Sequence, residues 1–353
     1  MSWGRFFLLP FALLYGLVVT IRNKLFDWGV LPSADFDLPV IGVGNLSAGG
    51  TGKTPHIEYL IRLLGDDYPL AVLSRGYKRR THGFALVRAD STTAAVGDEP
   101  LQIKRKFPDV VVAVNERRRR GIARIMKEHP EVRVILLDDA FQHRYVKPGL
   151  NLLLTEYYFP FFRNFLLPCG TLREPKSQVK RADALIVTKT PPVFSPLDRR
   201  AILQSLKPFR IKSVMFSSLA YSDWVPLQAG KKAVRQNRVK TIFLFTGIAN
   251  TSALEEHLKP QCQELIVTKF PDHHAFRGGD LRKLRKRYEE NLSRSKVLIT
   301  TEKDYMRLQD PRLLKLLSGL PAFYIPVEVA LDKDDRSDFD DMVRYYVDSF
   351  FSG

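Results

Sequence analysis

The chain has 353 residues, of which 45% are hydrophobic, so it is long enough for two buried cores and is not disordered in composition. Its two cysteines, Cys169 and Cys262, lie far apart, which argues against a disulfide framework or a zinc site and fits a reducing compartment. The formal net charge of +17 predicts an anionic partner, either a nucleic acid or an anionic lipid or membrane.

The amino-terminal segment favours a membrane as that partner. Phe6 to Ile21 carries no charged residue, and Arg5, Arg22 and Lys24 flank it. As a helix this run would measure about 24 Å, less than the roughly 30 Å of a bilayer's hydrocarbon core. We therefore expect residues 1–30 to form a helix that lies in or shallowly penetrates the membrane interface. A buried core helix is the alternative, whereas a secretory signal would separate the following loop from cytosolic nucleotide.

A glycine-rich loop follows the first predicted strand. Pro39 to Val43 predicts a buried strand, residues 56–64 predict a helix, and Gly44 to Thr54 between them is typical of a phosphate-binding loop. Ser47 stands where the first glycine of G-x-x-x-x-G-K-[ST] usually occurs. We expect nucleotide binding by Ser47, Gly49, Gly50, Thr51, Gly52, Lys53 and Thr54. Lys53 would reach the β- and γ-phosphates of ATP, and the Thr54 hydroxyl would hold Mg²⁺.

Further along the chain, apolar strands alternate with helical segments. The predicted strands are 70–74, 84–88, 110–114, 132–137, 150–154 and 184–187, and the helices are 101–107 and 117–128. This alternation predicts an α/β fold of the P-loop NTPase type, a mostly parallel sheet with helices on both faces, which we assign to residues 31–208.

A second, smaller α/β domain is expected at residues 209–325. Its predicted strands are 211–219, 224–226, 239–245, 264–270 and 297–300, and its helices are 251–258 and 281–291, the latter capped by Asp280. Residues 326–353 would return to the first domain and end in a helix packed on it.

Several carboxylates lie where predicted strands end or predicted helices begin. Asp138 and Asp139 end a Walker-B-like strand, at the edge where parallel sheets bind ligands. With Thr54 and Glu99 they are candidate Mg²⁺ ligands, although a pair of solvated turn aspartates is the alternative. Asp98 is a candidate general base, and the Asp272-His273-His274 loop is a candidate source of its partner, with an ordinary polar loop as the alternative.

Basic residues flank this predicted cleft. They are Arg75, Lys78, Arg79, Arg80, Arg117, Arg118, Arg119, Arg120 and Arg173. Arginine suits bidentate phosphate recognition, although such runs are often solvated faces. A nucleic-acid site would interleave aromatic residues with the cations, and Tyr77 is the one aromatic near the first cluster, which disfavours nucleic acid as the partner.

Eight motifs in chain order resemble those of one family, the tetraacyldisaccharide 4′-kinases, which are the lipid A 4′-kinases of Gram-negative bacteria. In the first half they are Val43 to Pro55, Leu73-Ser74-Arg75-Gly76-Tyr77, Gly97-Asp98-Glu99-Pro100, Asp138-Asp139-Ala140-Phe141-Gln142-His143 and Gly170-Thr171-Leu172-Arg173-Glu174-Pro175. In the second half they are Thr246-Gly247-Ile248-Ala249-Asn250, Phe270-Pro271-Asp272-His273-His274 and Thr301-Glu302-Lys303-Asp304. Ala140 stands where the family often has glycine.

The resemblance implies transfer of the γ-phosphate of ATP to the 4′-hydroxyl of a tetraacylated glucosamine disaccharide 1-phosphate, with Mg²⁺. It implies catalytic roles for Asp98 as base, His273 as its partner and Lys53. The residues implied to line the lipid head group are Arg75, Tyr77, Arg117, Arg173 and Glu174. The implied partners are the anionic acylated disaccharide and a membrane surface, without nucleic acid or a required protein, at the cytoplasmic face of the inner membrane.

A membrane-associated P-loop GTPase or ATPase switch, or a transport ATPase, is the rival hypothesis. Guanine-binding proteins use an N-K-x-D element after a strand, whereas Thr188-Lys189-Thr190-Pro191 lacks the aspartate. A nucleic-acid-dependent ATPase is a third hypothesis, and it predicts stimulation by DNA or RNA rather than by lipid.

Overall fold

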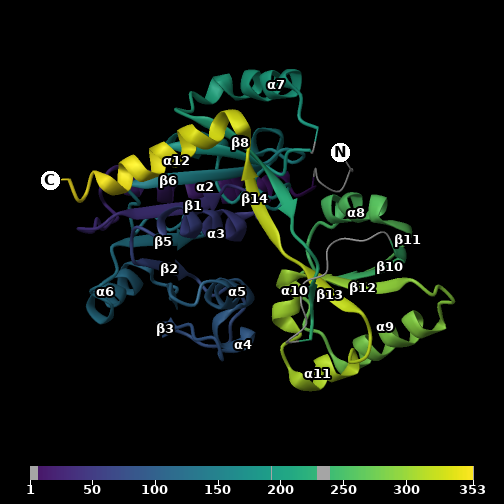
Figure 1. Cartoon of the computed structure of the whole chain (residues 1–353). Helices are drawn as coiled ribbons and strands as arrows, with labels where there is room; N and C mark the ends of the chain where they lie inside the picture. The colour runs from purple at the N-terminus through teal and green to yellow at the C-terminus, as the bar shows by residue number, and fades with distance from the viewer. Residues whose placement is uncertain (1–6, 192, 229–238, 353) are drawn as a thin grey trace.

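Two β-sheets of different size organise the computed structural model, which describes residues 7–191, 193–228 and 239–352 (Figure 1). The strands of the larger sheet are β1 Val40–Asn45, β2 Leu70–Ser74, β3 Ala85–Leu86, β4 Val111–Val114, β5 Val134–Asp138, β6 Leu150–Glu156, β7 Ala184–Thr188, β8 Val214–Tyr221 and β14 Val327–Leu331. Their order is β14-β8-β7-β6-β1-β5-β2-β4-β3. The pairing is parallel except where β14 joins β8 and β3 joins β4.

Helices cover both faces of the larger sheet, as its fully buried central strands require. The helices α3 Lys53–Leu64, α5 Asp98–Lys106 and α12 Lys333–Asp348 share one apolar core with one face of the strands. The helices α6 Arg118–Glu128 and α7 Pro196–Leu206 pack in separate cores on the other face. Adjacent strand residues such as Val40 and Ile41 enter different cores, because successive side chains alternate across a sheet.

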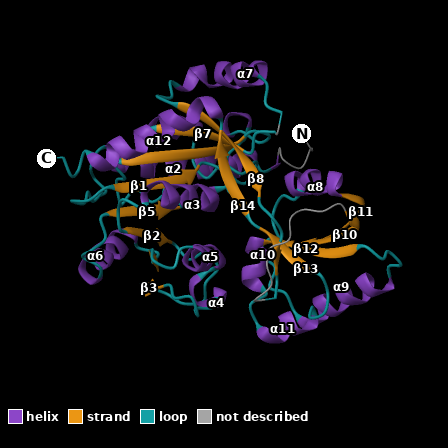
Figure 2. Cartoon of the chain, in the orientation of Figure 1, coloured by secondary structure: helices purple, strands orange, loops and turns teal. Residues whose placement is uncertain are grey.

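The smaller sheet and its helices occupy one side of the molecule in Figure 2. Its strands are β9 Val225–Pro226, β10 Val239–Thr246, β11 Cys262–Lys269, β12 Lys296–Thr301 and β13 Ala322–Ile325, in the order β11-β10-β12-β13-β9. Its helices are α8 Ser252–Leu258, α9 Gly278–Glu290, α10 Glu302–Arg307 and α11 Pro311–Leu316. The remaining short elements are α4 Thr93–Val96, η1 Phe161–Arg163, η2 Lys176–Arg181, η3 Lys207–Phe209 and η4 Lys259–Gln261.

The predicted start of the second domain at residue 209 is corrected by β8. This strand pairs in parallel with β7 through a crossover that contains α7, and so belongs to the larger sheet. The chain passes to the smaller sheet after Tyr221 and returns after Pro326, and the Ser222 N–H donates to the Pro326 carbonyl at 3.1 Å. The two connections therefore lie side by side (Figure 1). Local hydrophobicity predicted the strand, but its pairing depends on how the crossover packs.

A second correction concerns the start of α9. Asp280 is not the residue before the helix. It lies in the first turn, and its Oδ2 accepts the Arg277 N–H at 2.9 Å. The aspartate still satisfies a backbone donor at this helix end, from inside the helix.

The amino-terminal helix α2 spans Leu9–Asp27, which lies within the predicted residues 1–30 and extends beyond the uncharged run that ends at Ile21. It is the one described helix whose length and apolar composition match a membrane span. Its apolar residues Leu13, Leu14 and Leu17 are between 57% and 68% exposed, which disfavours a buried core helix. Polar contacts fix α2 to the protein. Tyr15 Oη donates to the Arg173 carbonyl, Arg22 Nη2 donates to the Gln142 carbonyl, and Arg144 donates to Asn23 and to Asp27.

Candidate functional site

The phosphate-binding loop connects β1 to α3. Gly49 and Gly52 have φ values of +130° and +88°, which glycine adopts without the strain of a side chain. The described structure shows no side-chain cap at the start of α3, so its first N–H groups face the loop without such a partner. Lys53 Nζ lies 3.4 Å from Asn45 Oδ1 and 3.6 Å from Asp139 Oδ1. The loop thus directs backbone donors and one cation toward the same end of the sheet.

Asp138 ends β5 beside this loop. Its Oδ2 accepts the Ser74 hydroxyl at 3.0 Å, whereas its buried Oδ1 has no hydrogen-bond partner among the described residues. Burial raises the pKa of Asp138 to about 6, and the charge of Glu99 adds to this effect while Lys53 opposes it. Arg118 Nη2 donates to the Asp138 carbonyl at 2.9 Å. A buried carboxylate oxygen without a partner is an oxygen ligand that Mg²⁺ can use.

The other two carboxylates predicted to bind Mg²⁺, those of Asp139 and Glu99, are already bound by cationic side chains. Both oxygens of Asp139 accept from Arg173, at 2.8 and 3.0 Å, and Glu99 Oε1 accepts from Lys303 Nζ at 2.8 Å. Burial favours the neutral acid, yet Arg173 and Lys53 hold the pKa of Asp139 well below its usual range. The described residues contain no cluster of three His, Cys, Asp or Glu side chains suited to a metal. Mg²⁺ is commonly held by one or two carboxylates together with phosphate and water, so the residues present fit it.

Asp98 and His273 meet across the two sheets, although they are 175 residues apart in sequence. His273 Nδ1 lies 3.1 Å from Asp98 Oδ2, and the Glu99 N–H donates to Asp98 Oδ1 at 3.1 Å. The Tyr77 ring stands edge-on to His273, with the ring centroids 5.3 Å apart. His274 instead lies 3.0 Å from Asp280. The structure therefore brings the predicted partner to Asp98 and turns the neighbouring histidine away.

Two cations from α10 join this pair, and the sequence analysis assigned them no role. Arg307 contacts Asp98 Oδ2 through Nε at 3.1 Å and through Nη2 at 2.5 Å. Burial opposes ionisation of Asp98, but the His273 hydrogen bond and the charges of Lys303 and Arg307 keep its pKa well below the usual range. Lys303 lies in the Thr301-Glu302-Lys303-Asp304 motif, and that motif was the available sequence signal for this contribution.

The residues predicted to line the lipid head group differ in how exposed they are. Arg75 and Tyr77 are exposed on the loop after β2, and Arg173 joins the site through Asp139. Glu174 is only 1% exposed and pairs with Arg181, so its burial is at odds with the predicted direct contact to a lipid. This ion pair instead holds the loop that carries Arg173.

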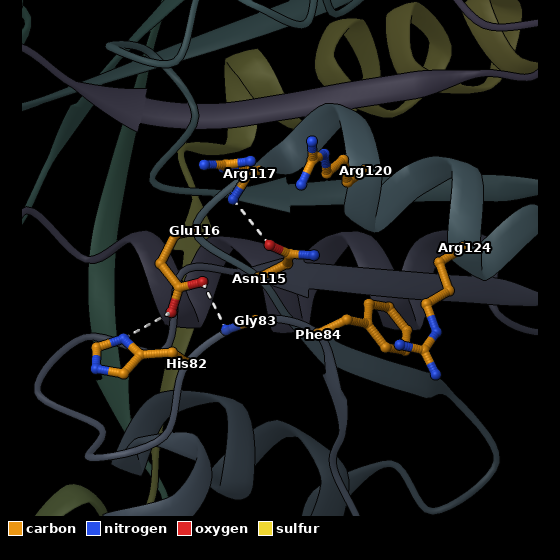
Figure 3. A pocket seen from close by; sticks show the side chains of 8 residues that line it. All are labelled: His82, Gly83, Phe84, Asn115, Glu116, Arg117, Arg120 and Arg124. Atoms are coloured by element: carbon orange, nitrogen blue, oxygen red, sulfur yellow. Dashed lines mark hydrogen bonds and ion pairs between the residues drawn. The ribbon is translucent and has the colours of Figure 1, made fainter.

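Arg117 lies at a basic cavity of about 630 Å³ (Figure 3). The residues lining the cavity are His82, Gly83, Phe84, Asn115, Glu116, Arg117, Arg120 and Arg124. The neighbouring Arg118 is buried and turns away to the Asn115 and Asp138 carbonyls. Of these two arginines, Arg117 is therefore the one at the cavity.

Comparison with known proteins assigns the chain to a family. The profile described as tetraacyldisaccharide-1-P 4′-kinase matches residues 4–345. The chain belongs to this family. It is similar to tetraacyldisaccharide 4′-kinases from Phocaeicola vulgatus, with 43% identity over 96% of this chain and 94% of the relative, and from Flavobacterium psychrophilum, with 43% identity over 99% and 98%.

A solved structure resembles the whole chain as well. The structure described as the "apo" form of LpxK from Aquifex aeolicus in complex with ATP has a TM-score of 0.72 and 28% identity. The match covers 97% of this chain and 99% of that one. Family membership makes this chain an ATP-dependent kinase of the lipid A precursor, with ATP and Mg²⁺ as cofactors. The comparisons do not favour the switch or transport ATPase hypothesis.

Proposed function

We propose that Asp98 is the general base of the 4′-kinase reaction and that His273 is its hydrogen-bonded partner. The observation that carries this proposal is the 3.1 Å contact between His273 Nδ1 and Asp98 Oδ2, made by a buried carboxylate across the two sheets. A positioned carboxylate can take the proton of the acceptor hydroxyl while the hydroxyl attacks the γ-phosphate. His273 would hold the carboxylate and share in stabilising the transferred proton.

The phosphate loop would bind ATP. The backbone N–H groups of residues 47–54 and the Lys53 ammonium would surround the phosphates and orient the γ-phosphate toward the acceptor. Thr54 and the unpartnered Asp138 oxygen would hold Mg²⁺, which supplies charge neutralisation on the phosphates when bound. Asp139 would act mainly by orienting Lys53 and Arg173.

The exposed basic residues would bind the head group of the acceptor. Arg75 and Tyr77 are exposed on the loop after β2, and the Tyr77 ring contacts His273 of the Asp98–His273 pair. The cavity beside Arg117 presents guanidinium groups of the kind that bind phosphate. The anionic end of the disaccharide is the ligand that this chemistry fits.

The apolar face of α2 would bring this site to the membrane. Its exposed leucines and the contacts of Tyr15 and Arg22 with the catalytic loops support an interfacial position at the cytoplasmic face of the inner membrane. The acyl chains of the acceptor would then stay in the membrane while the head group enters the site.

The test is transfer of ³²P from γ-labelled ATP to a tetraacyldisaccharide 1-phosphate in detergent micelles with Mg²⁺. We expect the parent enzyme to label the lipid and Asp98→Asn to lose about 10²- to 10⁴-fold in kcat, as is usual when a general base is removed. Unchanged ATP binding by the variant would show that its nucleotide site is intact. Full activity of Asp98→Asn would exclude the proposed base.

A further inference from the structure

Arg307, on α10 beside the smaller sheet, contacts the proposed base Asp98 directly, and the proposed function gives it no role. Its Nε and Nη2 contact Asp98 Oδ2, and Nη2 also lies 3.2 Å from His273 Nδ1. Its Nη1 donates to the Gly247 carbonyl at 3.0 Å and to Asp304 Oδ1 at 2.8 Å. The guanidinium is buried, and its donors are directed at protein groups rather than at open solvent.

Asp304 explains why Arg307 is held in this position. It is fully buried, and its Oδ2 accepts the hydroxyls of Thr246 and Thr301, each at 2.7 Å, and the Gly247 N–H at 3.1 Å. Its other oxygen accepts from Arg307, which lies three residues later on α10. A carboxylate with this many donors has little rotational freedom, so the arginine that it binds is also held in place.

The contacts differ between the two oxygens of Asp98. Oδ2 is contacted by His273 and twice by Arg307, whereas Oδ1 accepts one backbone N–H, that of Glu99. A carboxylate oxygen has two lone-pair sites, so Oδ1 keeps one for a further donor. The oxygen bound to the smaller sheet is thus distinct from the oxygen that can receive a proton.

We propose that Arg307, the last residue of α10, is a positioning residue for phosphoryl transfer, which binds Oδ2 of Asp98 and thereby presents Oδ1 to the acceptor hydroxyl. The proposal rests on the proposed function of Asp98 as base. It assigns Arg307 no contact with ATP or lipid. Removing it should therefore reduce the rate of the chemical step more than the binding of either substrate.

The test compares Arg307→Met and Arg307→Lys in the full-length enzyme. We expect Arg307→Met to lower kcat roughly 100-fold while KM for ATP and for lipid changes less than about threefold, because a small misplacement of a reacting group costs this much. Arg307→Lys should recover roughly tenfold of that loss, since it keeps the charge but not the planar fork. Arg312→Met is the matched control, because Arg312 is 90% exposed and pairs with Asp310.

A double-mutant cycle separates positioning from general structural damage. In the Asp98→Asn background, adding Arg307→Met should lower kcat by less than about twofold, because the carboxylate that Arg307 positions is gone. Equal losses in both backgrounds, or a kcat for Arg307→Met within threefold of the parent, would overturn the proposal. If thermal unfolding shows that Arg307→Met does not fold, the same cycle with Arg307→Lys decides between these outcomes. An active Asp98→Asn enzyme would refute the proposed base instead, whatever Arg307→Met does.

Discussion

The Tyr15 hydroxyl on the amino-terminal helix donates to the main-chain carbonyl of Arg173 at 2.9 Å. The side chain of Arg173 in turn binds both oxygens of Asp139, which lies 3.6 Å from Lys53 Nζ. One continuous set of contacts therefore leads from the apolar helix to the phosphate loop. The helix contributes to the geometry of the site as well as to the proposed attachment to the membrane.

Removing the Tyr15 hydroxyl tests this connection. We expect Tyr15→Phe to raise KM for the lipid about fivefold, because the loop carrying Arg173 loses a hydrogen bond worth about 1 kcal/mol. KM for ATP should stay within twofold, as the phosphate loop keeps its own contacts. Steady-state kinetics in mixed micelles measures both constants. Tyr345→Phe, at an exposed position on α12, is the control, and equal effects of the two variants would contradict the expectation.

The two adjacent histidines should differ in their effect on catalysis. His273→Ala removes the partner of Asp98, so we expect kcat to fall about 10- to 100-fold, less than for loss of the base itself. His274→Ala should stay within about threefold, because His274 faces Asp280. Single-turnover phosphorylation of the lipid isolates the chemical step. A larger loss for His274→Ala than for His273→Ala would show that the partner is wrongly assigned.

A buried cluster at the interface of the two sheets should make stability depend on pH. Lys106 contacts Glu58 at 2.7 Å and Glu302 at 3.3 Å, and Gln102 donates to both carboxylates. Burial and the charge of Glu58 raise the pKa of Glu302 from 4.5 to about 7, while Lys106 opposes the rise. Between pH 4.5 and about pH 7 the folded protein binds more protons than the unfolded chain, because Glu302 is protonated only in the folded state. The stability that protonated Glu302 contributes is complete below pH 4.5 and is lost as the pH rises through about 7.

Glu302→Gln should therefore flatten the dependence of the free energy of unfolding on pH between roughly pH 5 and pH 7. The parent should lose up to about 1.4 kcal/mol per pH unit more than the variant in this window. Denaturant unfolding at several pH values measures the difference. Glu290→Gln, at an exposed i,i+4 pair with Lys286, should leave the slope unchanged. Parallel curves for the parent and Glu302→Gln would refute the role of Glu302.

Charges on the exposed face of α2 should weaken attachment to a membrane. We expect the Leu13→Asp, Leu17→Asp double variant to bind anionic phospholipid vesicles at least tenfold more weakly, because each aspartate replaces an apolar side chain with a charge that resists burial. Vesicle co-sedimentation measures the partition constant. Leu292→Asp is the matched control, since Leu292 follows α9, far from α2 in the sequence, and is 97% exposed. Unchanged binding of the double variant would exclude α2 as the membrane contact.

The sequence alone determined the local parts of this protein. The strand, glycine-rich loop and helix around Lys53 and Thr54 were predictable because glycine spacing and hydrophobic periodicity act within a few residues. The position of Asp138 at a buried strand end followed from the same kind of signal. The family motifs also identified Asp98 and His273 as a pair, although their contact depends on the whole fold.

Only the tertiary structure decided which distant parts meet. It placed β8 in the larger sheet, buried Glu174 against Arg181, and brought Arg307 to Asp98 across 209 residues of sequence. Such contacts depend on how crossovers pack and on which buried charges find partners, and neither is encoded in a local pattern. The loop around Lys53 and Thr54 could therefore be predicted from the sequence. The contacts of the proposed base Asp98 could not, because they form only when the two halves of the protein pack together.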